Sequence, residues 1–124
     1  MNLISRFMET PKDMHWSVGK RIMRYITGTR DCGIMYESTK KKDLIGYTYN
    51  YFAGSLDDRK STSDFLFHLG SGVISWASKK QPIMTLSSVE AEYVAATLAT
   101  CQAVWLRRIF DGLKQKQQIS TTIY

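Results

Sequence analysis

Short apolar runs separated by polar turns occupy the middle of the chain, and longer stretches of helical periodicity lie on either side. Apolar side chains recur at near-helical spacing over residues 11–26, which predicts a helix with Pro11 in its first turn. Three runs rich in aromatic and aliphatic residues predict strands at 44–52, 63–69 and 73–78. The Gly-Ser-Gly sequence at 70–72 is typical of a tight turn. The pattern therefore predicts a three-strand antiparallel meander.

A long helix is predicted over residues 88–113, after this meander. Ser87 and Glu90 have the spacing of a capping box, in which side chains satisfy backbone donors at the helix entrance. The β-branched residues 119–123 predict the opening of a fourth strand. Three strands, a helix and a further strand indicate an α/β domain with a mixed sheet.

Three finer expectations follow from the same pattern. The apolar run 33–37 predicts a further short strand. One helix face is predicted to carry Val89, Tyr93, Ala96, Thr97, Thr100 and Val104. The aromatic residues of the predicted strands are more often core than base-stacking platforms, so we expect a core role for Tyr47, Tyr51, Phe52 and Trp76 and keep stacking on bases as the alternative.

Composition limits the possible functions. The 124 residues fit one domain, and no apolar run is long enough to span a bilayer. The two cysteines match no metal-ligand spacing, and the first residues lack the apolar centre of a secretory signal. We therefore expect an intracellular protein of the cytoplasm or nucleus, not secreted and with no membrane partner.

A basic excess favours a polyanionic partner. The chain has 17 basic and 11 acidic residues, a net charge of +6. Several basic residues occur in local groups at predicted turns or strand ends, which suits phosphate contact and suits simple solvation equally well. The groups include Lys40 to Lys42, Arg59-Lys60 and Lys79-Lys80.

Seven strings of the sequence resemble the end of the Pol polyprotein of copia-type retrotransposons. They occur in that family's order and at its spacing, and together they cover nearly the whole chain. The strings are HWSVGKRIMRYITGT (15–29), GIMY (33–36), LIGYTYNYFAG (44–54), LDDRKSTS (56–63), ISWASKKQP (74–82), LSSVEAEYVA (86–95) and AVWLRRI (103–109).

The resemblance implies a division of the chain into two parts. Residues 1–42 would be a remnant of the helical connection that follows the reverse transcriptase. Residues 43–124 would be the front of a ribonuclease H-like domain, truncated at its C-terminal end. The family hydrolyses the RNA strand of RNA–DNA hybrids with two Mg²⁺ ions held by acidic side chains. An RNA–DNA hybrid or another nucleic acid is therefore the expected partner.

The same resemblance assigns the catalytic positions. The family's first metal-binding aspartate aligns with Tyr49, and a second acidic position aligns with Tyr51. A tyrosine is uncharged at neutral pH and larger than a carboxylate. Glu92 matches the carboxylate of the long helix and is the candidate catalytic and metal-binding remnant, with an ordinary exposed glutamate as the alternative. Two further family carboxylates would lie beyond Tyr124.

These positions lead us to expect a catalytically inactive chain that binds no Mg²⁺ productively. The candidate nucleic-acid contacts are Arg59, Lys60, Lys79 and Lys80, the last two beside the expected substrate groove with Gln81. Asp57, Asp58 and Asp64 are better explained as a solvated loop and its edge than as metal ligands. Two alternatives stay open: a co-opted interaction scaffold or small effector, and a longer gene product that restores the missing carboxylates.

Overall fold

The computed structural model describes residues 8–38, 43–54 and 59–124. Its contacts divide the chain into two units, Met1–Ile34 and Met35–Tyr124. Lys40 to Lys42, Asp57 and Asp58 lie outside the described residues, so the expectations for them stay predictions. The boundary between residues 42 and 43 also stays a prediction.

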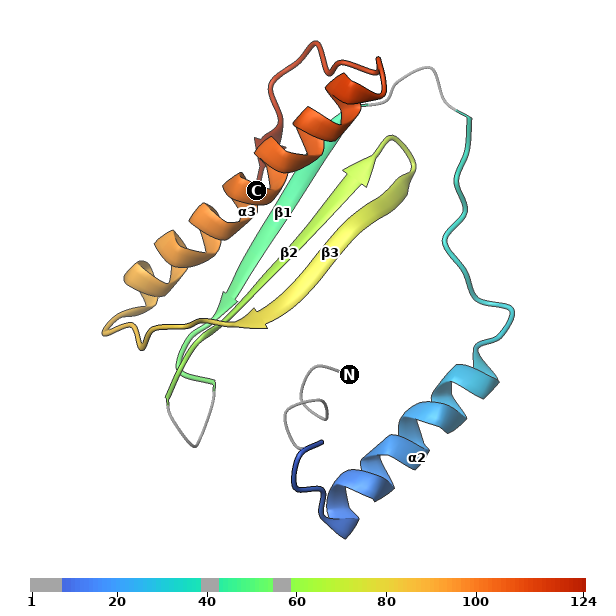
Figure 1. Cartoon of the computed structure of the whole chain (residues 1–124), viewed down its shortest axis with the longest axis vertical. Helices are drawn as coiled ribbons and strands as arrows, with labels where there is room; N and C mark the ends of the chain where they lie inside the picture. The colour runs from blue at the N-terminus through green and yellow to red at the C-terminus, as the bar shows by residue number, and fades with distance from the viewer. Residues whose placement is uncertain (1–7, 39–42, 55–58) are drawn as a thin grey trace. The chain divides into compact units, whose positions relative to one another are not determined.

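The first unit contains the helix α2, Asp13–Gly28 (Figure 1). It begins two residues after the predicted start, because the chain at Lys12 is still extended and forms the N-cap. The backbone N–H of Lys12 donates to Nδ1 of His15 at 3.0 Å, so this histidine closes the helix entrance. None of the residues of α2 is buried.

The second unit is an α/β structure with a four-stranded mixed sheet. The strands are β1 (Leu44–Tyr51), β2 (Thr62–Leu69), β3 (Gly72–Lys80) and β4 (Thr122–Ile123), in the order β3-β2-β1-β4. The first three pair antiparallel, whereas β4 pairs parallel to β1. The predicted meander and the predicted start of a fourth strand are thus confirmed. The arrangement is compatible with a ribonuclease H-like fold.

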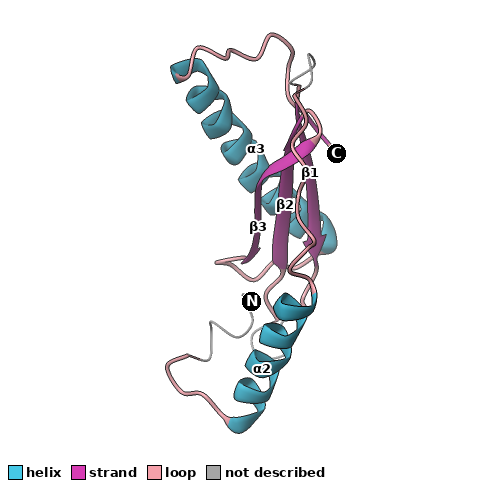
Figure 2. Ribbon diagram, turned by 90° about the vertical axis from the view of Figure 1, so that its right-hand side faces the viewer, coloured by secondary structure: helices cyan, strands magenta, loops and turns pink. Residues whose placement is uncertain are grey.

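The helix α3, Ser88–Gly112, packs against β1 and β2 (Figures 1 and 2). Its start follows the predicted capping box with one difference. Ser87 Oγ accepts from the Glu90 N–H at 3.1 Å, but Glu90 Oε2 accepts from the N–H of Leu86 at 2.7 Å rather than from the N-cap residue. None of the described helices is long and apolar enough to cross a membrane.

The core lies between α3 and the sheet and is built from unusually small helix residues. The buried residues of α3 recur at intervals of three or four, and they are Ala91, Ala95, Ala99, Ala103 and Leu106. Phe67 and Leu44 supply the bulk from the sheet side. A Cβ at Gly46 would lie 2.6 Å from Cε1 of Phe67, so only glycine fits at this strand position. Alanine allows the helix to approach closely.

Two finer expectations are wrong. Residues 33–37 form no strand, because the segment makes isolated side-chain contacts and no ladder: the Tyr36 hydroxyl donates to the Val73 carbonyl at 2.7 Å. The aromatic residues that were predicted to lie in the core are also exposed. Tyr47, Tyr51 and Trp76 retain 47–65% of their surface, because the helix packs on the opposite face of the sheet, and Phe52, which follows β1, retains 41%.

Candidate functional site

Tyr49 occupies the first expected metal-ligand position, near the end of β1. The register places it beside Asp64 of β2 and leaves 64% of its surface exposed. Side chains alternate between the two faces of a strand. The adjacent Asn50 has its Oδ1 3.5 Å from Nε2 of Gln81, beside the start of α3. Tyr49 therefore lies on the face that α3 does not cover, and so does Tyr51.

Glu92 lies in the second turn of α3 and is exposed. It directly follows Ala91, whose buried side chain faces the sheet, so Glu92 belongs to the helix surface. Tyr49 thus lies on the sheet face that α3 does not cover, and Glu92 lies on the exposed surface of α3. The expectation that Glu92 is a catalytic and metal-binding remnant stays a prediction.

The donor set at these positions does not fit a pair of magnesium ions. Mg²⁺ prefers several hard oxygen ligands in octahedral geometry, and two adjacent dications repel each other unless anionic ligands lie between them. A phenol and one carboxylate do not meet this requirement. Across 8–38, 43–54 and 59–124, no group of three His, Cys, Asp or Glu side chains could hold a metal ion.

The four candidate basic residues gather at one end of the β2–β3 pair. Arg59 and Lys60 precede β2, while Lys79 and Lys80 end β3 opposite Ser63 and Thr62. Lys60 Nζ donates to the Pro82 carbonyl at 2.7 Å, which holds this lysine against the chain after β3. Lys79 and Lys80 alternate between the two faces of the sheet. The structure therefore brings the four residues to one end without joining them in one flat patch.

Gln81, expected beside a substrate groove, is instead a buried anchor. It is 1% exposed, and its Nε2 donates to Ser63 Oγ at 2.8 Å and to the Ala91 carbonyl at 2.9 Å. Its Oε1 is buried and accepts no hydrogen bond. One side chain thus ties the end of β3 to β2 and to the first turn of α3.

A second buried polar contact supports the same junction. Ser61 and Thr85, 0% and 4% exposed, have their hydroxyl oxygens 3.2 Å apart. Ser61 Oγ also accepts from the N–H of Ala53 at 3.1 Å, which fixes the chain after β1. Sequence reasoning missed this cluster, because serine, threonine and glutamine give no local sign of burial.

Arg107 fixes the approach to β4. Its guanidinium donates to the carbonyls of Ile119 at 2.7 Å and Gln117 at 3.0 Å, and to the Thr121 hydroxyl at 3.2 Å. A surface hollow beside it is lined by Val104, Arg107, Arg108, Asp111, Lys116 and Gln117. Because the Arg107 donors point to the backbone, this arginine acts as a strut for the last segment.

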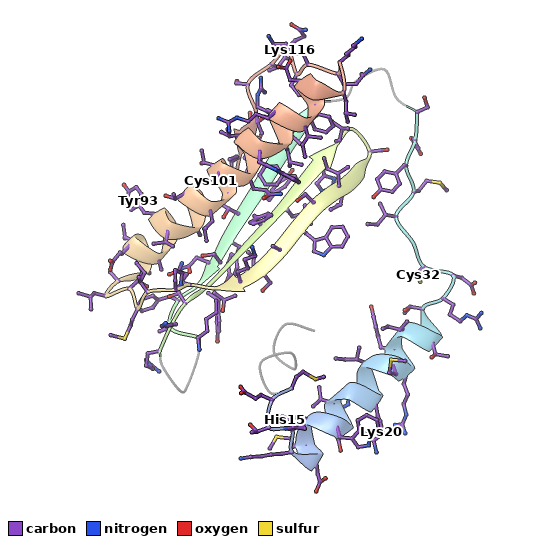
Figure 3. All side chains as sticks on the ribbon, in the orientation of Figure 1. His15, Lys20, Cys32, Tyr93, Cys101 and Lys116 are labelled. Atoms are coloured by element: carbon purple, nitrogen blue, oxygen red, sulfur yellow. The ribbon has the colours of Figure 1, made fainter. Side chains whose placement is uncertain are left out.

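The exposed face of α3 carries side chains that take no part in the core. Tyr93 and Cys101 are exposed on this helix (Figure 3), and Val89 and Val104 retain 58% and 45% of their surface. The face predicted from Val89 to Val104 is therefore an outer face, and the buried face is the neighbouring row of alanines.

Comparison with known proteins gives two kinds of relative. The chain is 41% identical over 106 residues to the Secreted RxLR effector protein 161 of Plasmopara viticola, which is 86% of this chain and 75% of that protein. It is 41% identical over 122 residues to the retrovirus-related Pol polyprotein from transposon TNT 1-94 of Nicotiana tabacum. It is 38% identical over 113 residues to the Pol polyprotein from transposon RE2 of Arabidopsis thaliana.

The coverage of these relatives is uneven. The alignments with the two polyproteins include 96% and 91% of this chain but span 9% and 8% of the polyproteins. The chain therefore corresponds to less than a tenth of the length of those Pol relatives. No protein-family model and no solved structure matches the chain.

Proposed function

This chain belongs to the copia-type retrotransposon Pol family, and from that membership we propose that it is a ribonuclease H-like segment that does not hydrolyse RNA in RNA–DNA hybrids. The observation that carries the proposal is Tyr49, which stands where the family resemblance places the first metal-binding aspartate. Its ring lies on the sheet face that α3 does not cover.

The electrostatic reason is the charge that two metal ions require. In a two-metal mechanism, the ions lie about 4 Å apart and stabilise the attacking and leaving oxygens together. Their mutual repulsion is offset by anionic ligands that bridge or flank them. A neutral phenol supplies no such charge, and Glu92 alone supplies one. We therefore propose that the chain binds no Mg²⁺ productively.

Manganese binding tests the ligand part of the proposal without relying on catalysis. Mn²⁺ prefers oxygen ligands as Mg²⁺ does, and its paramagnetism allows free and bound ion to be counted by electron paramagnetic resonance. We expect the wild-type chain and Glu92→Gln to bind Mn²⁺ equally weakly. Saturable binding of two ions that Glu92→Gln weakens tenfold would refute the proposal.

Nucleic acid is the proposed partner, through the basic group Arg59, Lys60, Lys79 and Lys80. The support is their common position at one end of the β2–β3 pair and the net charge of +6. Contacts to phosphate release counterions, so the affinity falls as salt rises. We expect hybrid binding in a filter assay at about 50 mM salt and much weaker binding at about 200 mM. Absent binding at low salt, or binding insensitive to salt, would reject this partner.

A second candidate function is a non-catalytic interaction scaffold or small effector. The observation that favours it is that this chain covers three quarters of a relative whose name describes a secreted effector and no polymerase. Localisation separates the two candidates: we propose that this chain stays in the cytoplasm or nucleus. Fractionation of the producing cells, with the chain detected in the secreted fraction, would favour the effector function.

A further inference from the structure

The sheet face opposite α3 is a continuous aromatic surface. Successive outward positions of β1 are Tyr47, Tyr49 and Tyr51, and the strand register places Leu66 and Trp76 beside Tyr47. Tyr124 follows β4 and stacks on Tyr47, with ring centroids 5.5 Å apart. We call these six residues the open face, because α3 packs against the other side of β1 and β2.

Two rings of the open face, Tyr47 and Tyr124, are held by aromatic contacts, and the face is still largely exposed. Tyr47 packs edge-on against His68 at 5.9 Å between centroids, in addition to its stacking on Tyr124. Tyr49, Trp76 and Tyr124 retain 64%, 65% and 68% of their surface. Rings held in place by neighbours lose little further freedom when a partner covers them, which lowers the entropic cost of association.

The exposed area is close to what one side of a stable protein interface requires. An aromatic side chain has roughly 200 Å² of surface, so five rings that are about half to two-thirds exposed present roughly 600 Å². Leu66 and the neighbouring outward residues of β2 and β3 add to this area. A standard interface buries about 800 Å² on each partner, and its core is enriched in tyrosine and tryptophan.

Charge decides which partner fits. The outward positions of β2 and β3 that pair in register with Tyr47, Tyr49 and Tyr51 include one cationic side chain, Lys80, and one anionic side chain, Asp64. These side chains add no net charge. A polyanion would gain little attraction there, and its phosphates would approach the Asp64 carboxylate. A second copy of the same face meets no net repulsion from these side chains.

We propose that the open face is the interface of a homodimer, in which two copies of this chain pack sheet against sheet through their tyrosines and Trp76. Packed sheets lie about 10 Å apart, a separation that interdigitating aromatic side chains fill. The contact is isologous, so the same six residues contribute from both copies. The proposal is independent of the catalytic state of the chain.

Sedimentation of the full 124-residue chain tests the proposal. We expect a species of twice the 14.2 kDa chain mass at concentrations within about 1–100 µM, with dissociation on dilution. Tyr49→Lys and Trp76→Lys place an unpaired charge in the interface from two different strands. Each is expected to weaken association at least tenfold while circular dichroism stays that of the wild type.

Tyr93→Lys is the matched control, because Tyr93 is 72% exposed on the outer surface of α3. It is expected to leave the dimer unchanged. Three outcomes would overturn the proposal: a wild-type chain that stays monomeric at about 100 µM, a dimer that both open-face variants leave intact, or a Tyr93→Lys dimer weakened as much as theirs. If a monomeric chain instead binds a single-stranded oligonucleotide, and Tyr49→Lys abolishes that binding, nucleic acid and not a second copy is the partner of the open face.

Discussion

Replacement of Gln81 by alanine tests how strongly the second unit depends on a single buried amide. The side chain is 1% exposed, donates to Ser63 Oγ and to the Ala91 carbonyl, and has a longer contact of 3.5 Å with Asn50 Oδ1. Truncation leaves both acceptors buried without this donor, at a cost of about 1–3 kcal/mol, and the empty volume adds to that cost. The substitution also removes the buried Oε1, which has no hydrogen-bond partner, and this recovers part of the lost stability.

The expected loss for Gln81→Ala is therefore about 3 kcal/mol, out of a total of roughly 5–15 kcal/mol for a small domain. For a unit of this size, such a loss lowers Tm by more than about 10 °C. Gln81→Met keeps most of the volume but loses the hydrogen bonds, so it should fall between wild type and alanine. Calorimetry or thermal circular dichroism measures all three proteins.

Gln118→Ala is the matched control, because this glutamine is exposed and its loss should change stability by less than about 0.5 kcal/mol. Should Gln81→Ala melt within about 2 °C of wild type, the buried amide would not hold the junction, and the reasoning from burial would be refuted.

Three further substitutions examine separate parts of the structure. Arg107→Ala removes the hydrogen bonds to the segment before β4, so amide hydrogen exchange should become faster than in the wild type over residues 117–124 and stay unchanged in β2. If exchange over residues 117–124 changes no more than exchange in β2, Arg107 does not hold this segment. Ala99→Leu overpacks the helix–sheet contact and should lower stability by about 1–3 kcal/mol in urea titration, whereas a neutral effect would show a looser core. Ser87→Ala loses the N-cap and should cost about 1 kcal/mol; no change in the melt would mean that Glu90 suffices.

The order of elements in the second unit was predictable from local signals. Apolar runs gave the three strands, the Gly-Ser-Gly sequence at 70–72 the turn, and Ser87 with Glu90 the helix start. These signals act over a few residues and depend little on the rest of the fold. The fourth strand was predicted for the same reason, from its β-branched residues.

The faces of the elements were harder to predict, because size alone does not say which side is buried. In β1, the bulky tyrosines point outward, while Gly46, Thr48 and Asn50 face the helix. At Gly46 a larger residue would clash with Phe67 of β2 and Ile123 of β4, and the helix residues buried on this side are mostly alanines. The expectation of an aromatic core failed for this reason.

The positions of the candidate site come from the family resemblance, whereas their surroundings depend on the fold. The matching strings gave Tyr49 and Glu92 their positions in the chain, but the sheet face on which Tyr49 lies depends on strand register and on where α3 packs. Gln81 had been grouped with the lysines before it, and its burial depends on contacts with three separate elements. Such long-range contacts leave no periodic trace in the sequence.

Cleavage of a labelled RNA–DNA hybrid tests the central claim most directly. The purified chain, its Glu92→Gln variant and an active ribonuclease H as positive control are incubated with the same hybrid in Mg²⁺ and then in Mn²⁺. The account predicts an intact RNA strand with both forms of this chain and fragments with the positive control. Fragments produced by the wild-type chain and abolished by Glu92→Gln would contradict it.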